Sequence, residues 1–550
     1  MKIADTTRRY WYTLRYLKPI QFYRRLWFRF CRPRLSTNTL PTLRVRSGPW
    51  QAPAERTQSL IEPDVFVFLR QSHRLPQQGG WNNPTLEKLW LYNLHYFDDL
   101  NAVGNAQRSH WHLILIKRWV NENLPTVGNG WEPYPTSLRM VNWVKWCAAG
   151  GDLPAPCMES LALQARWLMK RLEWHLQGNH LFANAKALVF AGLFFQGPES
   201  AAWLSTGLRI IRAQLPEQVL PDGGNFERSP MYHAIFMEDL LDLINAASAW
   251  PEFVPGELVV LWREAASRML AWLTGMTHPD GQIGLFNDAA FGVAPDPLVL
   301  RSYAARLGVR PKSALSMEVR PIQYWPQSGY ARLCKGPAVA LLDLAPIGPD
   351  YLPGHAHADT LSFELSVGEQ RLIVNGGTSR YGVGPERQQE RGTAAHSTVE
   401  VAGQSSSEVW GGFRVARRAY PFALDIQKSD AALILACSHD GYTRLTGRPV
   451  HRRCWRMTAK GLAVEDSVTG GAHAAVARFI LHPAVQIVVH SGSTLSLQRS
   501  GLPSILVRVV QGQLRLDAAS YCPEFGLVMP TQCLSVSLIN GQAMTQFQWS

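Results

Sequence analysis

The sequence predicts an α+β protein in two parts, a helical region followed by a β-rich region. Between about Pro84 and Arg306, apolar residues recur every three or four positions, which is the period of a helix with one buried face. After Ser328 apolar and polar residues alternate, which is the period of a strand. With 550 residues, of which 46% are hydrophobic, the chain is long enough for two or three domains with substantial cores.

The helical region, which we place at residues 81–315, divides into eight segments. Short turns rich in Gly, Pro and Asn separate them, and helices joined by short turns pack as antiparallel neighbours. The expected helices are Leu86–Val103, His110–Glu122, Thr136–Ala149, Glu159–Leu176, Phe182–Phe195, Glu199–Ala213, Pro230–Ala249 and Glu257–Met276.

The β region, which we place at residues 325–550, follows a Pro-punctuated linker that runs from Arg310 to Pro326. Short strands with Gly, Asp and Ser turns predict an antiparallel β-sandwich or a pair of stacked sheets. The expected strands are Val339–Leu344, Leu361–Val367, Arg371–Asn375, Thr398–Val401, Leu433–Ser438, Val476–Leu481, Val485–His490, Thr494–Gln498, Ile505–Val510 and Cys533–Asn540.

Residues 1–80 form a basic region that we expect to be helical or extended. Arginines are interleaved with aromatic residues in it, as in Phe22–Phe30. Two interpretations are open: an amphipathic helix that lies on a membrane or a partner, or a helix that packs its aromatic side on the protein body. The segment lacks the apolar core and small-residue cleavage site of a secretory signal. We therefore expect a cytoplasmic location by default, with the periplasm left open.

The chain is basic, with 55 Lys and Arg against 42 Asp and Glu, a net charge of +13. A surface of this charge favours a polyanionic partner, which could be nucleic acid, anionic lipid or an acidic polysaccharide. No nucleic-acid-binding motif accompanies the charge, so nucleic acid is the weakest of the three. The eight cysteines are scattered without a CxxC pair, which argues against a zinc ribbon. The oligomeric state is not predicted.

Four polar clusters carry residue types that suit proton transfer. They are Gln177–His180, Asp222–His233, Gly354–Asp359 and Arg391–Thr398. Imidazoles titrate near neutrality, and His355 and His357 share a face if their segment is extended. Each cluster also has a purely structural interpretation: a helix cap, a packed tyrosine or a structural histidine at a strand start.

Tyr232 is the candidate proton donor in the second cluster. Ser229 reads as a helix N-cap and Pro230 as the first helical residue, which puts Tyr232 in the first turn. The positive end of the helix dipole and the neighbouring Arg228 should both lower the pKa of its phenol.

Together the clusters resemble the heparinase II/III-like family of polysaccharide lyases. The resemblance covers roughly residues 85 to 420, and its specific motif is Gly354-His355-Ala356-His357-Ala358-Asp359. It also takes in Asn93–Tyr96 and Trp131–Pro135. The resemblance implies an incomplete α/α toroid followed by an antiparallel β-sandwich, and cleavage of an acidic polysaccharide by β-elimination between the two domains.

The resemblance also implies residue roles. Asn179, with His180 beside it, matches the position that neutralises the uronate carboxylate. Tyr232 matches the acid that protonates the leaving O4, and in some members of the family the tyrosine makes both proton transfers. His355 matches a base on the other side of the sugar, or a second stabiliser of charge. The expected substrate-binding residues are Trp131, Tyr134, Arg139, Asn225, Arg228 and Tyr381.

The family often carries a structural zinc ion, and the matching positions here are His357, Asn375 and His396. An amide at position 375 cannot supply the anionic oxygen that zinc prefers. We therefore expect that no cofactor is required, that a structural zinc ion is weakly bound or absent, and that hydrogen bonds join these three residues instead.

The leading functional hypothesis is a lyase that acts on a uronate-containing polysaccharide, in the degradation or assembly of a capsule or exopolysaccharide. One alternative is a uronate C5-epimerase, which abstracts the same proton but returns a proton to C5. The other is a non-catalytic polysaccharide-binding or scaffold protein.

Overall fold

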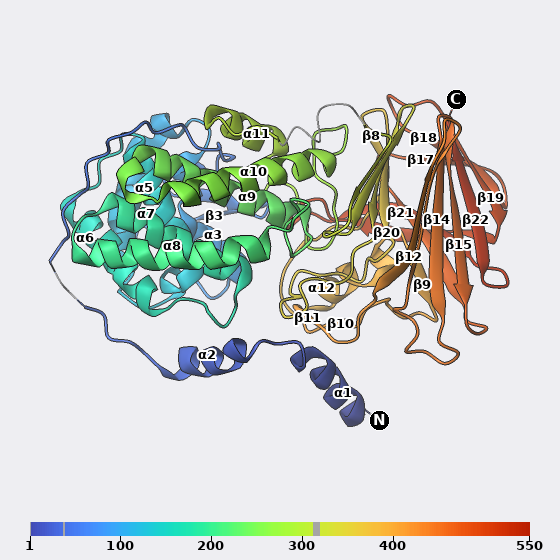
Figure 1. Cartoon of the computed structure of the whole chain (residues 1–550), viewed down its shortest axis with the longest axis horizontal. Helices are drawn as coiled ribbons and strands as arrows, with labels where there is room; N and C mark the ends of the chain where they lie inside the picture. The colour runs from blue at the N-terminus through green and yellow to red at the C-terminus, as the bar shows by residue number, and fades with distance from the viewer. Residues whose placement is uncertain (1, 37–38, 312–319, 550) are drawn as a thin grey trace.

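A computed structural model describes residues 2–36, 39–311 and 320–549. It confirms the predicted order of a helical half followed by a β half, which lie beside each other (Figure 1). Residues 312–319, in the middle of the expected linker, lie outside the described residues. The C-terminal end of that expected linker is instead a strand, β4 (Ile322–Trp325).

Each of the eight expected helical segments contains a helix. The bounds are α3 (Lys88–Tyr96), α4 (Ser109–Glu122), α5 (Pro133–Ala148), α6 (Ala155–Lys170), α7 (Gly178–Phe194), α8 (Pro198–Gln218), α9 (Pro230–Ala249) and α10 (Gly256–Gly275), followed by an unexpected α11 (Pro297–Arg306). The first helix is shorter than expected because Phe97 takes a left-handed conformation, with φ 61°, and ends it. All residues of helix α7 from Leu181 to Phe194 are buried, and only Asn184 and Lys186 among them are polar, so the helix lies inside this half.

Two stacked antiparallel sheets form the β half. The first has the order β20-β21-β16-β8-β7-β6-β5-β4, with β9 paired to β16, and the second has the order β12-β13-β14-β15-β22-β19-β18-β17. Their inward-facing side chains, among them Phe363, Trp455, Phe479 and Phe547, form one core.

The strand bounds are β5 (Tyr330–Lys335), β6 (Ala338–Asp343), β7 (Phe363–Val367), β8 (Gln370–Val374), β9 (Val399–Val401), β12 (Pro421–Lys428), β13 (Leu433–His439), β14 (Val450–Thr458), β15 (Gly461–Thr469), β16 (Ala475–Leu481), β17 (Gln486–Ser491), β18 (Thr494–Gln498), β19 (Ile505–Gln511), β20 (Gln513–Tyr521), β21 (Met529–Ser537) and β22 (Gln542–Gln548). Several of them, including β12, β14, β15, β20 and β22, were not expected. In β14 the reason is that His451 and Arg453 point inward, toward Asp466, and interrupt the apolar alternation.

The N-terminal region holds two helices and a small sheet. The helices α1 (Lys2–Leu14) and α2 (Pro19–Phe30) lie along one side of the molecule, outside both halves (Figure 1). The sheet, which was not expected, consists of β1 (Leu60–Glu62), β2 (Val65–Phe68) and β3 (Gln71–Arg74). Among the residues that the structure describes, no helix is both long and apolar enough to cross a membrane.

Candidate active site

The candidate site lies where loops of the helical half meet loops of the β half. Asn179 and His180 stand in the first turn of α7, directly after Gln177 and Gly178, which both have left-handed backbones with φ 65° and 54°. A Cβ atom on Gly178 would lie 2.4 Å from Leu352 Cδ2 and 3.1 Å from a Glu227 carboxylate oxygen. Glycine at this position therefore lets the start of α7 contact the loop that precedes β7.

Tyr232 occupies the first turn of α9, as predicted. Its backbone N–H donates to Ser229 Oγ at 3.2 Å, so Ser229 is the N-cap. The Tyr232 hydroxyl lies 2.8 Å from the Tyr381 hydroxyl, and the ring centroids of Tyr232 and His355 are 3.9 Å apart. This contact joins a helix of the first half to the loop that carries His355 in the second.

Asp288 binds His355 at the Nδ1 atom of its imidazole ring. The Nδ1 atom of His355 lies 2.9 Å from Asp288 Oδ2, and the same carboxylate contacts His357 Nε2 at 2.8 Å and Arg387 Nη2 at 2.7 Å. Burial opposes ionisation of Asp288, but Arg387 and the two histidines outweigh it and hold its pKa well below the usual range. An ionised Asp288 only accepts hydrogen bonds, so Nδ1 of His355 carries a proton.

Glu227 links His355 to the start of α7. It is buried, its Oε2 atom lies 3.6 Å from His355 Nε2, and it accepts a hydrogen bond from the Asn179 backbone. Burial raises the pKa of its carboxyl, although His355 acts in the opposite direction. The row thus runs from the Asn179 backbone through the Glu227 carboxyl and the His355 imidazole to the Tyr232 phenol.

His180 lies beside this row and is favoured in its charged form. Its Nδ1 atom is 3.2 Å from Glu173 Oε1, and its ring centroid is 4.6 Å from that of Tyr134. Burial would lower the pKa of His180, but the Glu173 carboxylate outweighs burial and raises it. Asn184 Nδ2 donates to the other Glu173 oxygen at 3.1 Å and keeps the carboxylate in place. The raised pKa therefore favours an imidazolium next to Asn179.

The structure brings together Asn179, His180, Tyr232, His355, Tyr134 and Tyr381 from the residues named in the sequence analysis. Asn179, His180, Tyr134, His355 and Tyr381 are each partly exposed, so this group is in contact with solvent.

The expected substrate contacts of Trp131 and Arg139 are wrong. Both side chains are buried in the helical core, where Trp131 Nε1 donates to the Asn123 carbonyl at 3.2 Å. The Arg139 guanidinium carbon lies 3.7 Å from the Trp119 ring, and its Nε donates to Gln164 at 2.9 Å. These residues stabilise the wall behind the site.

Arg228 and Asn225 also have internal partners in place of an open surface. Arg228 donates to the carbonyls of Ser328 and Pro346 at 3.1 and 3.0 Å, which ties the two halves together. Buried Asn225 accepts from the Glu227 backbone at 3.0 Å. The structure therefore gives both residues a positioning role behind the row.

The expected lowering of the Tyr232 pKa is wrong as well. Burial raises the pKa of its phenol well above the ordinary value, and nearby Tyr381 and Asp288 act in the same direction. The Arg228 guanidinium points away to the Ser328 and Pro346 carbonyls at the boundary of the two halves, and burial outweighs any lowering of the Tyr232 pKa. In the free protein Tyr232 is a neutral phenol.

The three positions matched to a metal site do not form a donor set that suits zinc. Nδ1 of His357 lies 3.2 Å from Nε2 of His396, but the third member is an amide. Oδ1 of Asn375 accepts from the Ser397 backbone at 3.2 Å, and its Nδ2 donates to Ser362 Oγ at 3.4 Å. Within residues 2–36, 39–311 and 320–549, no group of three His, Cys, Asp or Glu side chains could hold a metal ion. Zinc prefers four ligands that include thiolate, imidazole or carboxylate, so the fit is poor.

Three residues of the site were missed in the sequence. Asp288 and Glu173 orient His355 and His180, and Arg387 holds Asp288 ionised. The pair Asn287-Asp288 interrupts an otherwise apolar loop, and this was the available signal for Asp288. Glu173 and Arg387 had no distinguishing local pattern.

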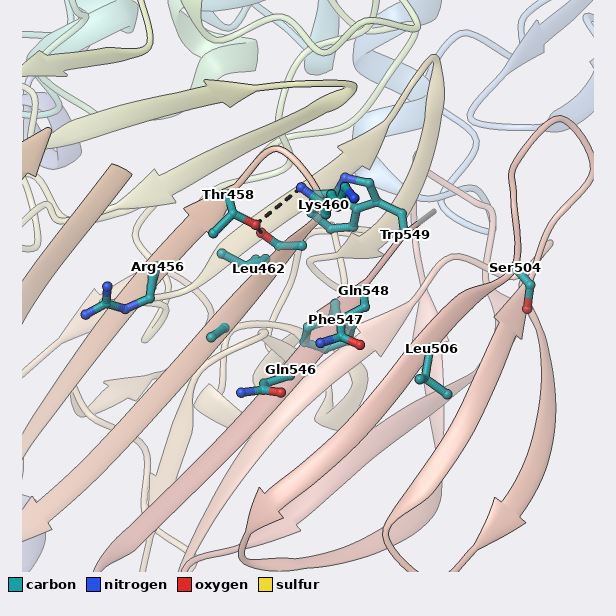
Figure 2. A pocket seen from close by; sticks show the side chains of 12 residues that line it. Arg456, Thr458, Lys460, Leu462, Ser504, Leu506, Gln546, Phe547, Gln548 and Trp549 are labelled. Atoms are coloured by element: carbon teal, nitrogen blue, oxygen red, sulfur yellow. Dashed lines mark hydrogen bonds between the residues drawn. The ribbon is translucent and has the colours of Figure 1, made fainter. Parts of the chain in front are cut away.

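A groove of about 560 Å³ lies elsewhere, on the eight-stranded sheet (Figure 2). Strands β14, β15, β19 and β22 line it, with Arg456, Lys460, Gln546 and Gln548 among the polar side chains. No carboxylate or imidazole is present among the described residues that line it. It therefore offers no carboxylate or imidazole for proton transfer, whereas the row around Tyr232 contains both.

Comparison with protein families gives two matches. A model for the heparinase II/III N-terminus matches residues 156–314, and one for the heparinase II/III-like C-terminal region matches residues 317–550.

Two relatives illustrate different extents of similarity. A heparin-sulfate lyase from Bacteroides stercoris is 31% identical over 114 residues, which cover 20% of this chain and only 17% of that protein. The FtsZ-localized protein C of Caulobacter vibrioides is 28% identical over 446 residues, which cover 76% of this chain and 72% of that protein.

Solved structures share the fold over nearly the whole chain. A crystal structure of heparinase III has a TM-score of 0.71 at 17% identity. The match covers 95% of this chain and 88% of the heparinase III chain. A crystal structure of a heparan sulfate lyase from Pedobacter heparinus has a TM-score of 0.57 at 17% identity. The match covers 87% of this chain and 79% of the lyase chain. At this identity the likeness concerns the fold alone.

Proposed function

This chain belongs to the heparinase II/III-like family, and on that premise we propose that it is a polysaccharide lyase acting on a uronate-containing polysaccharide by β-elimination. The observation that carries the proposal is the contact of Tyr232 with His355, joined through Glu227 to Asn179. An acid, an imidazole and a carboxylate-binding amide are the groups that such a reaction needs, and they come from opposite halves of the chain.

Neutralisation of the uronate carboxylate is the first requirement. The C5 proton is weakly acidic until hydrogen-bond donors and positive charge stabilise the enediolate-like charge that develops on the carboxylate. We assign this task to the Asn179 side chain and to His180, whose raised pKa favours the imidazolium form. Both stand in the first turn of α7, where the positive end of the helix dipole also favours an anion.

Proton transfer is the second requirement. Asp288 accepts the Nδ1 proton of His355, which leaves Nε2 as the base that takes the C5 proton. The electron pair of the C5–H bond forms the C4–C5 double bond, and the C4–O4 bond breaks. The neutral phenol of Tyr232 gives its proton to the leaving O4.

The two proton-transfer groups act from one side of the sugar in this proposal. With ring centroids 3.9 Å apart, Tyr232 and His355 leave no room for a pyranose between them. We therefore replace the initial expectation, in which His355 acts from the opposite side of the sugar, by removal of the proton and departure of O4 on the same side.

A product assay tests the proposal. The purified protein is incubated with a panel of uronans, including heparan sulfate, chondroitin and alginate, and products are followed by the absorbance of the unsaturated uronate and by mass. Unsaturated oligosaccharides from one or more substrates are expected. Entry of solvent deuterium at C5 without chain cleavage would instead identify a C5-epimerase.

A second candidate is a non-catalytic role in polysaccharide binding or in protein localisation. The observation behind it is the match to FtsZ-localized protein C, whose name states a location and no activity and which is similar over three quarters of this chain. Glycan binding with a measurable Kd, but with no unsaturated or deuterated product from any substrate, would support this candidate and contradict the lyase.

A further inference from the structure

An exposed apolar stripe runs along α2. Phe22, Leu26 and Phe30 are spaced by four residues and are 45%, 60% and 75% exposed. Residues four apart lie on one face of a helix, and Tyr23 and Trp27 widen the same face. Large apolar side chains arranged in this way on a surface mark an interaction site.

The opposite face of α2 is the one that packs on the protein body. Gln21 is buried and its Nε2 donates to the Tyr351 carbonyl at 3.2 Å. The Phe28 ring lies 4.3 Å from that of His175, and the Arg171 guanidinium carbon lies 3.6 Å from the Phe28 ring. The helix is therefore held in place while its apolar stripe faces solvent. The interpretation that the aromatic side packs on the body holds for Phe28 but is wrong for the stripe.

Helix α1 repeats the arrangement on the β half. Trp11 and Leu14 are exposed, whereas Thr13 Oγ1 accepts from Trp410 Nε1 at 3.1 Å and the Tyr10 ring contacts the Trp410 ring at 4.9 Å. Trp410 belongs to the short strand β10 (Val409–Trp410). Both helices are thus fixed on one side of the molecule (Figure 1).

Positive charge is concentrated in the same segment. Residues 1–34 contain ten Lys and Arg and a single acid, Asp5, so they supply most of the net charge of +13. Arg25 and Arg29 are exposed and flank the stripe by helical spacing. Arginine beside a row of Phe, Leu and Trp suits an anionic bilayer surface, where apolar side chains enter the acyl boundary and arginines meet phosphates.

From these observations we propose that α1 and α2 form a docking surface for a lipid bilayer that contains anionic phospholipids. An acidic polysaccharide would use the arginines and the flat rings, but it would leave Leu14 and Leu26 without a role. The proposal rests on the N-terminal helices alone, so it stands or falls independently of the lyase reaction.

Co-sedimentation of the full chain with vesicles tests the proposal. One set of vesicles contains equal parts of phosphatidylcholine and phosphatidylglycerol, and the other contains phosphatidylcholine only. Binding to the anionic vesicles alone is expected, and it should weaken as salt is raised. Replacing Arg25 and Arg29 by Gln should weaken binding about 30-fold, because each charge near the surface contributes about fivefold.

Matched controls separate docking from general surface effects. The stripe variant Leu26→Glu/Phe30→Glu should abolish sedimentation, whereas Leu124→Glu/Leu298→Glu, at equally exposed apolar positions, should not. The charge control is Arg209→Gln/Arg212→Gln on the exposed side of α8. Absence of wild-type binding, or equal losses in stripe and control variants, would overturn the proposal. The proposal would also be overturned if the wild type binds soluble alginate and the stripe variant loses that binding but still binds vesicles.

Discussion

The hydrogen bond between Tyr232 and Tyr381 allows the catalytic role of Tyr232 to be separated from its structural role. The two hydroxyls are 2.8 Å apart, so Tyr232→Phe and Tyr381→Phe each remove the same bond from one end. A neutral hydrogen bond of this kind contributes about 1 kcal/mol to stability. Both variants should therefore lower the free energy of unfolding by about 1 to 2 kcal/mol, which includes the cost of the partner left unpaired.

The two variants should differ in activity. Only Tyr232→Phe removes the proposed proton donor to O4, and loss of a general acid costs about 10²- to 10⁴-fold in rate. That loss corresponds to about 3 to 5 kcal/mol of transition-state stabilisation. Tyr381→Phe leaves the donor in place and removes only the bond that orients it, so a loss of about tenfold or less is expected, from a bond of about 1 kcal/mol.

The assay is the initial rate of unsaturated product formation, with denaturant unfolding of both variants measured in parallel. Equal loss of activity in the two variants at equal stability would assign the effect to the hydrogen bond and not to proton donation. Full activity of Tyr232→Phe would refute the assignment of Tyr232 as the acid.

Three further predictions concern charge and metal. If protonated His180 neutralises the substrate, kcat/KM should fall as the pH rises through the raised pKa of His180. Glu173→Gln removes the carboxylate that raises this pKa, so the fall in kcat/KM should move to lower pH. An unmoved pH profile would contradict the pairing of His180 with Glu173. Asp288→Asn should lower the free energy of unfolding by about 3 to 5 kcal/mol, because Arg387 stays buried without its carboxylate partner. The control Asp517→Asn, whose partner Arg515 is exposed, should change denaturant unfolding little, and equal effects would argue against the importance of the buried pair. Elemental analysis should find no stoichiometric zinc, and a chelator should leave Tm unchanged. One zinc ion per chain would show instead that a zinc site tolerates the amide at position 375.

Local signals in the sequence were sufficient to place most helices. The segment Pro230–Ala249 was assigned with the bounds that the structure has, because Ser229 caps it and Pro230 starts it. These signals act within one turn of the chain and need no partner elsewhere. The same is true of the change from a period of three or four to a period of two, which marked the order of the two halves.

Strands with charged inward positions could not be assigned in this way. His451 and Arg453 in β14 are tolerated inside the sandwich because Asp466 of β15 binds both, with His451 Nε2 at 2.8 Å and Arg453 Nε at 2.7 Å. The partner lies on another strand, so an alternation rule applied to β14 alone cannot detect it.

By itself, the sequence determined the order of the two halves and the set of polar clusters from which the site is drawn. The tertiary structure alone decided which members meet, and it reversed the expected direction of the Tyr232 pKa. A helix dipole and a neighbouring arginine predicted a lowered pKa, whereas burial dominates, and Tyr381, 149 residues away in sequence, acts in the same direction as burial. Caps and periodicity act over a few residues, but desolvation and ion pairing depend on what the whole chain places around a group.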